Sequence, residues 1–242
     1  MNEQSKHTVK SYDDALHELR SIITQMGGLS EAQLSGALEA LVERDEEKSL
    51  KVIASDKAID KLDMEAEEKA IKLIALRAPL ADDLREIVGA LKISSVLERV
   101  GDYAKNIAKR SVVLNRSKPI KPAVLIPQMV SLAKVMLKDV LDAYIDRDSE
   151  KAVAIWQSDQ AIDELYNSLF RELLTYMMEN PSLITPCTHL LFIAKNIERI
   201  GDHITNAAEI VYYLVEGKNL DIERPKSDET SYTMVKPPKG DK

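Results

Sequence analysis

The chain of 242 residues is 45% hydrophobic and 30% charged, which is enough for one large domain or two domains of roughly 100–120 residues. Eight glycines and 5% aromatic residues disfavour a β-barrel or β-sandwich, which need many turns, so we expect an all-α fold of long helices. The net charge of −7 disfavours nucleic acid as a partner, because no lysine and arginine stripe offsets the repulsion.

The first predicted helix is about 35 residues long and follows an expected tail at residues 1–8. Its apolar residues recur at intervals of three and four, as on the buried face of a helix: Leu16, Leu19, Ile23, Met26, Leu34, Leu38 and Leu41. The pair Gly27-Gly28 interrupts this pattern at a cost of roughly 1 kcal/mol per glycine relative to alanine. The pair therefore predicts either a kink or a close contact with another helix.

Two further helices complete a first bundle, expected at residues 9–116. Asp45 is the predicted N-cap of the second helix, which Pro79 ends. Asp82 and Asp83 favour the first turn of a third helix, which is expected to run to about Asn115.

The segment 117–127 is rich in proline and predicts a linker, after which helices restart at Gln128. The pattern then repeats as a second three-helix bundle at residues 128–220. The polar tail at 221–242 is expected to be disordered.

The second half of the chain repeats the first. LEALVERDEEKSLKVIASDKAIDKL, from Leu38, aligns with LDAYIDRDSEKAVAIWQSDQAIDEL, from Leu141. LERVGDYAKN at 97–106 aligns with IERIGDHITN at 197–206, so the offset changes by three residues in the turn between the helices. The chain is therefore predicted to be a tandem duplication of an up-down-up three-helix bundle.

The duplicated segments carry pairs of carboxylates at i and i+4, which lie about 5–6 Å apart on one helix face. These candidate metal ligands are Glu98 with Asp102, Glu198 with Asp202, Asp56 with Asp60, and Asp159 with Asp163. If the second and third helices of each bundle pack antiparallel, four carboxylates converge. Such hard oxygen donors suit magnesium, manganese, calcium or ferric iron better than structural zinc.

Two interpretations of the acidic pairs stay open. A shared functional constraint explains why Glu, Arg, Gly, Asp and Asn stay in phase, with Asn106 and Asn206 adding a neutral oxygen to each row. Alternatively, the acids form solvated faces that Arg99 and Arg199 neutralise. Gly101 and Gly201 lie inside the same segments and indicate the close approach of a neighbouring helix or of a ligand.

Motifs for familiar enzyme chemistry are absent from the sequence. It contains no phosphate-binding G-x-x-x-x-G-K-S/T loop and no G-x-S-x-G elbow, and it lacks the paired Glu-x-x-His motifs of di-iron bundles. Cys187 is expected in the core, and His203 on the surface, because its counterpart is Tyr103.

We expect a cytoplasmic protein. The single cysteine, Cys187, cannot form an internal disulfide, and MNEQSKHTVK lacks the apolar segment of a secretory signal. No apolar run reaches the ~20 residues needed to cross a bilayer. Any association with a membrane is therefore expected through partner proteins only.

The two motifs LERVGDYAKN and IERIGDHITN resemble the signature of the PhoU family of bacterial phosphate-transport regulators. The segments MGGLSEAQL, RAPLADDLREI, LLTYMMENP and EIVYYLVEGK also resemble family segments in the same order, so the likeness covers about residues 8–220.

This resemblance implies a non-enzymatic, commonly dimeric pair of bundles. Its implied role is negative regulation of phosphate uptake and of the phosphate-starvation response, as an adaptor between the ATPase subunit of the phosphate transporter and a sensor histidine kinase. Some family members hold multinuclear iron or zinc on the acidic motifs, which here fall on Glu98, Asp102, Glu198 and Asp202. The alternatives are a carboxylate-bridged di-metal enzyme, a metal-storage protein, and a helical scaffold whose acids bind nothing.

Overall fold

The computed structural model describes residues 3–221 together with residues 230 and 233. The helices of the first repeat are α1 (Glu3–Val42), α2 (Glu46–Arg77) and α3 (Asp82–Leu114). The 3-10 turn η1 (Lys121–Val124) leads into the second repeat, which contains α4 (Leu125–Asp146), α5 (Ser149–Ser158), α6 (Gln160–Glu179), η2 (Pro181–Leu183) and α7 (Ile184–Glu216). The predicted all-α tandem of bundles is confirmed.

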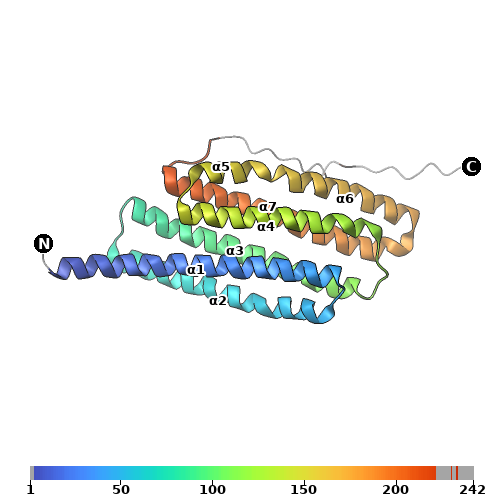
Figure 1. Cartoon of the computed structure of the whole chain (residues 1–242), viewed down its shortest axis with the longest axis horizontal. Coiled ribbons are helices and arrows are strands. Elements are labelled where there is room, and N and C mark those ends of the chain that lie inside the picture. Colours follow the sequence, from blue (N-terminus) through green and yellow to red (C-terminus); the bar gives the residue numbers. More distant parts are fainter. Residues whose placement is uncertain (1–2, 222–229, 231–232, 234–242) are drawn as a thin grey trace, which may run out of the picture.

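The long helices lie side by side along one common direction, with the first repeat below the second in Figure 1. α1 corresponds to α4, α2 to α5 and α6 together, and α3 to α7. The contacts between the repeats come mainly from α3 against α7 and from α1 against α4. Because each of these pairs joins two equivalent helices, the repeats are related by an approximate two-fold axis.

The repeated Arg-Asp pair between the first and second helices of each repeat has a structural role. Asp45 caps α2 by accepting the N–H of Lys48 at 3.0 Å, and Asp148 caps α5 by accepting the N–H of Lys151 at 2.9 Å. The N-cap predicted at Asp45 is therefore confirmed. Arg44, at a φ of 56°, donates to the carbonyl of Leu114 at 2.9 Å and so ties the end of α1 to the end of α3.

Three helix boundaries differ from the expectations. α1 begins at Glu3, inside the expected N-terminal tail, and α4 begins at Leu125, inside the expected linker. Pro127 is tolerated there because the first turn of a helix needs no N–H donor. The second helix of the second repeat is divided at Asp159, whereas α2 is continuous. Most of the tail expected at 221–242 lies outside the described residues.

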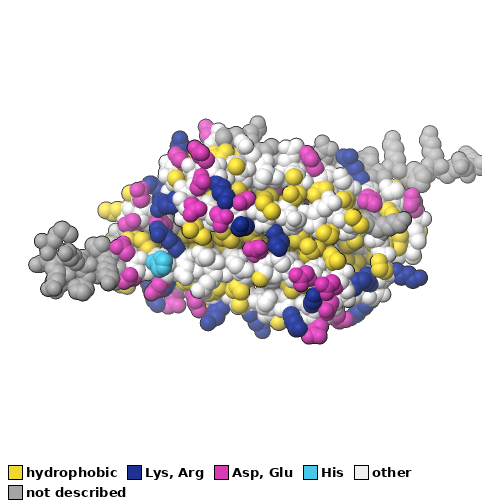
Figure 2. Space-filling view, viewed as in Figure 1, with side chains coloured by type: hydrophobic (Ala, Val, Ile, Leu, Met, Phe, Trp, Pro, Cys, Tyr) yellow, Lys and Arg dark blue, Asp and Glu magenta, His cyan; other side chains and the backbone are white. Residues whose placement is uncertain are grey.

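The core is continuous through both repeats and consists mainly of Leu, Ile, Val, Ala and Met side chains. Gly27 lies where α1 crosses α4: a Cβ at this position would be 2.5 Å from Cδ1 of Leu141. α1 remains one helix through the glycine pair, so the predicted close contact explains Gly27. Figure 2 shows acidic, basic and hydrophobic side chains interspersed over the visible face.

No helix in the part of the chain that the structure describes combines the length and the apolar content of a membrane-spanning segment.

Candidate functional site

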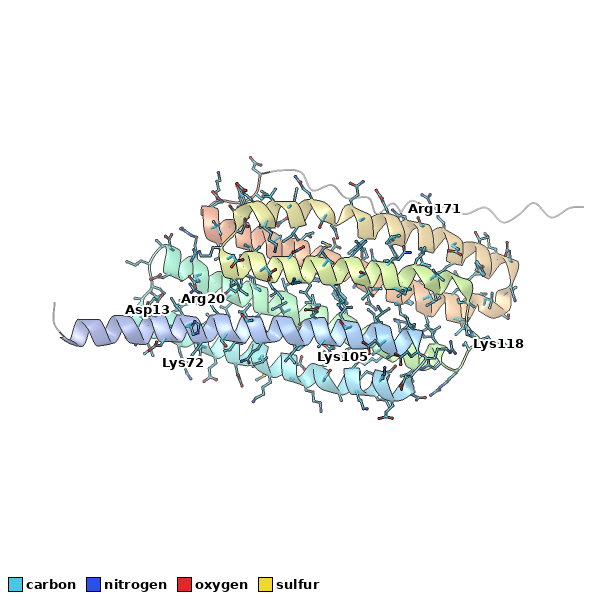
Figure 3. All side chains as sticks on the ribbon, viewed as in Figure 1. Asp13, Arg20, Lys72, Lys105, Lys118 and Arg171 are labelled. Carbon is cyan, nitrogen blue, oxygen red and sulfur yellow. The ribbon has the colours of Figure 1, made fainter. Side chains whose placement is uncertain are left out.

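Each repeat contains an acidic cluster between its second and third helices. In the first cluster, Asp56 of α2 is buried and accepts a hydrogen bond from Nε2 of Gln33, on α1, at 3.2 Å. The ammonium group of Lys105, on α3, lies 2.5 Å from Oδ1 of Asp102 and also contacts Oδ2 of Asp56. Figure 3 labels Lys105 within the first repeat. The cluster therefore already contains a cation, supplied by the chain itself.

The charges of the first cluster are strongly coupled. Burial alone would lower the pKa of Lys105, but its hydrogen bonds with Asp102 and Asp56 outweigh burial and raise it. Burial would likewise raise the pKa of Asp102, but the hydrogen bond and the charge of Lys105 lower it. Burial, and then the negative charge of Asp102, raise the pKa of Glu98 to about 7. The predicted pair of Glu98 and Asp102 therefore does interact.

The second cluster is more deeply buried. Asp159, Asp163 and Glu198 are all buried, whereas Asp202 is half-buried. Nζ of Lys195 lies 2.9 Å from Oε2 of Glu198 and 5.0 Å from the centre of the Tyr166 ring. This cluster also has a lysine, but from a different position of the repeat.

The two lysines do not correspond to each other. Lys105 corresponds to Thr205, and Lys195 corresponds to Ser95. Each repeat therefore supplies one lysine to its carboxylates, but from a different position. In α3, Lys105 follows Asp102 by three residues, whereas in α7, Lys195 precedes Glu198 by three residues. Neither lysine is among the site residues predicted from the sequence, although a lysine three residues from an acid is a signal that the sequence contains.

The other predicted site residues lie at the margins of the clusters. Asp60 is exposed, and burial and the charge of Asp56 raise its pKa. Arg99 is exposed and forms a long ion pair with Oδ2 of Asp102 at 3.6 Å. Arg199 and Asn206 are exposed, and Asn106 is half-buried. The contact of Arg99 supports the interpretation in which arginine helps to neutralise the acids.

The carboxylate oxygens have the chemistry that magnesium, manganese or iron prefers, but their arrangement does not match a metal site. Among the described residues, no group of three or more His, Cys, Asp or Glu side chains is placed to hold a metal ion. In the first cluster the Lys105 ammonium stands where such an ion would be bound. The first cluster therefore fits a metal ion only if Lys105 moves away.

Gly101 and Gly201 are explained by the approach of the second helix, as one of the two interpretations proposed. A Cβ on Gly101 would lie 2.8 Å from Cδ1 of Ile59 and 2.9 Å from Oε1 of Gln33. A Cβ on Gly201 would collide with Oδ1 of Asp159. The glycines thus let the buried aspartate region of the second helix pack against the third helix.

The pseudo-two-fold axis passes close to Tyr103 and His203, which occupy equivalent positions in α3 and α7. Their rings are 5.5 Å apart, and Oη of Tyr103 lies 3.3 Å from Nε2 of His203. His203 is therefore half-buried rather than on the open surface, and burial lowers its pKa.

Comparison with known proteins identifies the same duplication. The family model described as "PhoU domain" matches twice, at residues 23–111 and 126–211. The phosphate-specific transport system accessory protein PhoU homolog of Zymomonas mobilis is 51% identical over 88% of this chain and 90% of that protein. The homolog with the same description from Rhizobium meliloti is 50% identical over 93% of this chain and 95% of that protein.

Solved structures show the same fold. The crystal structure of PhoU from Pseudomonas aeruginosa has a TM-score of 0.83 at 34% identity and covers 86% of this chain and 100% of that chain. The phosphate transport system regulatory protein PhoU from Streptococcus pneumoniae has a TM-score of 0.81 at 33% identity and covers 87% of this chain and 100% of that chain.

Proposed function

Because the chain belongs to the PhoU family, we propose that it regulates phosphate transport as a non-enzymatic accessory protein and represses phosphate uptake and the phosphate-starvation response. The observation that carries this proposal is that the family domain matches both repeats of the chain. Relatives about 50% identical to the chain are named as accessory proteins of a phosphate-specific transport system. The lysine in each acidic cluster also favours a structural role over metal-dependent catalysis.

The proposed mechanism is that of a cytoplasmic adaptor, active as a homodimer. Its proposed partners are the ATPase subunit of the phosphate transporter and the sensor histidine kinase of the starvation response. When phosphate is plentiful, the adaptor holds the kinase in the state that favours its phosphatase activity.

Exposed apolar side chains near the α2–α3 turn offer one surface for such a partner. Leu76, near the end of α2, and Leu80, in the turn to α3, are 78% and 81% exposed. Large apolar side chains that gather on a surface commonly mark protein contacts. Met64 and Ile71 extend the exposed apolar residues along α2.

Deletion of the gene tests the regulatory role. We expect alkaline phosphatase and other starvation products to be made in phosphate-rich medium, and the wild-type gene to restore repression. Continued repression in the deletion strain would contradict the proposal. A pull-down from phosphate-rich and phosphate-starved cells, followed by mass spectrometry, would test the transporter and kinase partners directly.

Two matched variants test the surface at the α2–α3 turn. Leu80→Glu should reduce recovery of the transporter or kinase subunit at least fivefold and should weaken repression, without lowering the thermal midpoint. Val135→Glu changes a 57% exposed apolar residue on α4 and serves as the control. Equal losses in both variants would argue against a specific surface at the turn.

The metal predicted from the sequence is a second proposal, and the second cluster supports it better than the first. Asp159, Asp163 and Glu198 are buried there, and Thr205 takes the position of Lys105, although Lys195 contacts Glu198. A metal ion bound to these carboxylates would replace Lys195 as the partner of Glu198. Elemental analysis for iron, zinc, manganese and magnesium should find a metal in the wild type that Asp159→Asn with Asp163→Asn loses. Oxygen consumption by iron-loaded protein would favour the di-metal enzyme, and several iron ions per chain would favour storage.

A further inference from the structure

A pocket of about 400 Å³ lies between the repeats, where α1 and α3 of the first repeat meet α4 and α7 of the second. One wall carries two guanidinium groups, from Arg20 and Arg147, beside Glu86. The lining also includes apolar side chains of α7, among them Val211 and Val215. Figure 3 labels Arg20 near the end of the bundle at which α1 begins.

The charged wall is positive overall. Nε of Arg20 lies 2.5 Å from Oε1 of Glu86, and Nη1 of Arg147 lies 3.1 Å from Oε2. One buried carboxylate thus fixes two guanidinium groups and neutralises only one of them. Each guanidinium carries five N–H donors, and both arginine side chains remain about half exposed, so donors remain for a further oxygen atom.

Tyr144 lines the same pocket and carries a buried donor. The residue is 8% exposed, and its hydroxyl has no hydrogen-bond partner among the described residues. Burial, and then the charge of Glu86, raise the pKa of Tyr144, so the hydroxyl keeps its proton. Buried polar groups without a partner are uncommon because they cost about 1–3 kcal/mol each. An acceptor oxygen that reaches this hydroxyl from the pocket would remove this cost.

The duplication provides an internal comparison. The equivalent pocket on the other side of the pseudo-two-fold axis, about 510 Å³, is lined by Arg44 in place of Arg147. Its other equivalent positions are apolar where the first pocket is polar: Ala123 for Arg20, Leu41 for Tyr144 and Val124 for Ser21. The shared fold therefore accounts for the cavity and for one arginine, but not for the second arginine and the tyrosine.

We propose that the pocket between α1, α3, α4 and α7 binds a small molecule that carries an oxyanion group, phosphate or carboxylate, on an apolar body. Arg20, Arg147 and Tyr144 donate to the oxyanion, and Val211 and Val215 contact the body. Guanidinium groups bind both kinds of oxyanion in this way. The proposal does not depend on the regulatory role, since it rests on the pocket alone.

Calorimetric titration of the full chain with simple probes tests the proposal. Phenyl phosphate or benzoate should bind, and the stronger of the two identifies the preferred oxyanion. Inorganic phosphate lacks the apolar body and phenol lacks the charge, so each should bind at least fivefold more weakly. If neither anionic probe binds at millimolar concentration, or if phenol binds as well as both, the proposal is wrong.

Variants locate the binding. Tyr144→Phe removes only the hydroxyl, so it should weaken binding at least threefold without lowering the thermal midpoint of the free protein. Arg20→Gln should weaken binding at least tenfold, while Arg147 still pairs with Glu86. Lys118→Gln removes a positive charge from the equivalent pocket and should change nothing. Wild-type affinity in both Tyr144→Phe and Arg20→Gln would overturn the proposed site.

Discussion

Tyr103 and His203 stand at equivalent positions of the two repeats and contact each other across the pseudo-two-fold axis. Only residues near such an axis can meet their own counterparts. The contact therefore marks the centre of the α3–α7 interface, and it leads to a prediction about pH.

His203→Tyr should reduce the loss of stability at acid pH. Burial lowers the pKa of His203 in the folded protein, so between this lowered value and the ordinary value of about 6.5 the unfolded chain binds more protons. The contribution of His203 to stability is therefore present above about pH 6.5 and is lost as the pH falls. Urea unfolding at pH 8 and pH 5 should show that the free energy of unfolding falls less in the variant than in the wild type between pH 8 and pH 5. His17→Gln, at an exposed position, should show no such gain.

Glu98→Gln should have the opposite pH dependence. The pKa of Glu98 is raised to about 7 in the folded protein, so the folded state holds an extra proton between about pH 4.5 and 7. Ionisation across this interval destabilises the wild type and leaves the variant unaffected. Chemical unfolding should therefore show that the free energy of unfolding of the variant increases relative to that of the wild type as the pH rises from 4.5 to 8. The same trend in the exposed control Glu67→Gln would remove the support for this assignment.

Lys105→Thr places in the first repeat the residue that the second repeat has at this position. The change leaves Asp56 and Asp102 without their ammonium partner and should destabilise the protein by about 2 kcal/mol. This is less than the ~3–5 kcal/mol typical of a fully buried pair, because Asp102 is partly exposed. Denaturant titration at pH 7 measures the difference.

The same variant allows a rescue experiment. Adding Ser95→Lys to Lys105→Thr moves the lysine to the position used in the second repeat, three residues before Glu98, and should restore part of the lost stability. Manganese added to the single variant should also stabilise it if the vacated carboxylates can bind an ion. A double variant no more stable than the single variant would show that the two lysine positions are not interchangeable.

Gly101→Ala and Gly28→Ala should change stability in opposite directions. An alanine at 101 would displace Ile59 and Gln33 from the packed interface, which we expect to cost about 1–3 kcal/mol. At Gly28 no atom lies within 4 Å of the added Cβ, so the better helix propensity of alanine should stabilise by about 1 kcal/mol. Thermal unfolding of both variants tests the pair. Stabilisation in both would show that the helices adjust around position 101 without strain.

Local signals in the sequence predicted much of the fold. The N-cap at Asp45 and the end of the helix before Pro79 depend only on residues nearby in the sequence. The periodicity of apolar residues reflects the burial of one helix face. Both kinds of signal can be recognised without a structure. The repeated glycines also predicted close helix packing correctly, because an unfavourable residue inside a helix needs a local steric reason.

The site chemistry was less accessible, since it depends on contacts between distant helices. The i,i+4 rule identified the pair of Glu98 and Asp102, but it could not show that Lys105 also reaches Asp56 on another helix. The grouping of Arg20, Glu86 and Arg147 depends on how the two repeats pack, which no periodicity within one helix reveals. Whether a metal ion binds remains a prediction for both clusters.

The pairing of α3 with α7, and of α1 with α4, has a consequence for the origin of the chain. A single three-helix unit would already possess the surface needed to bind a second copy of itself, so a gene of half the length could have produced the same architecture from two identical subunits. Fusion of two such genes would then have released each half from the need to match the other. The different lysine positions and the different linings of the two equivalent pockets are changes that two identical subunits could never have acquired separately.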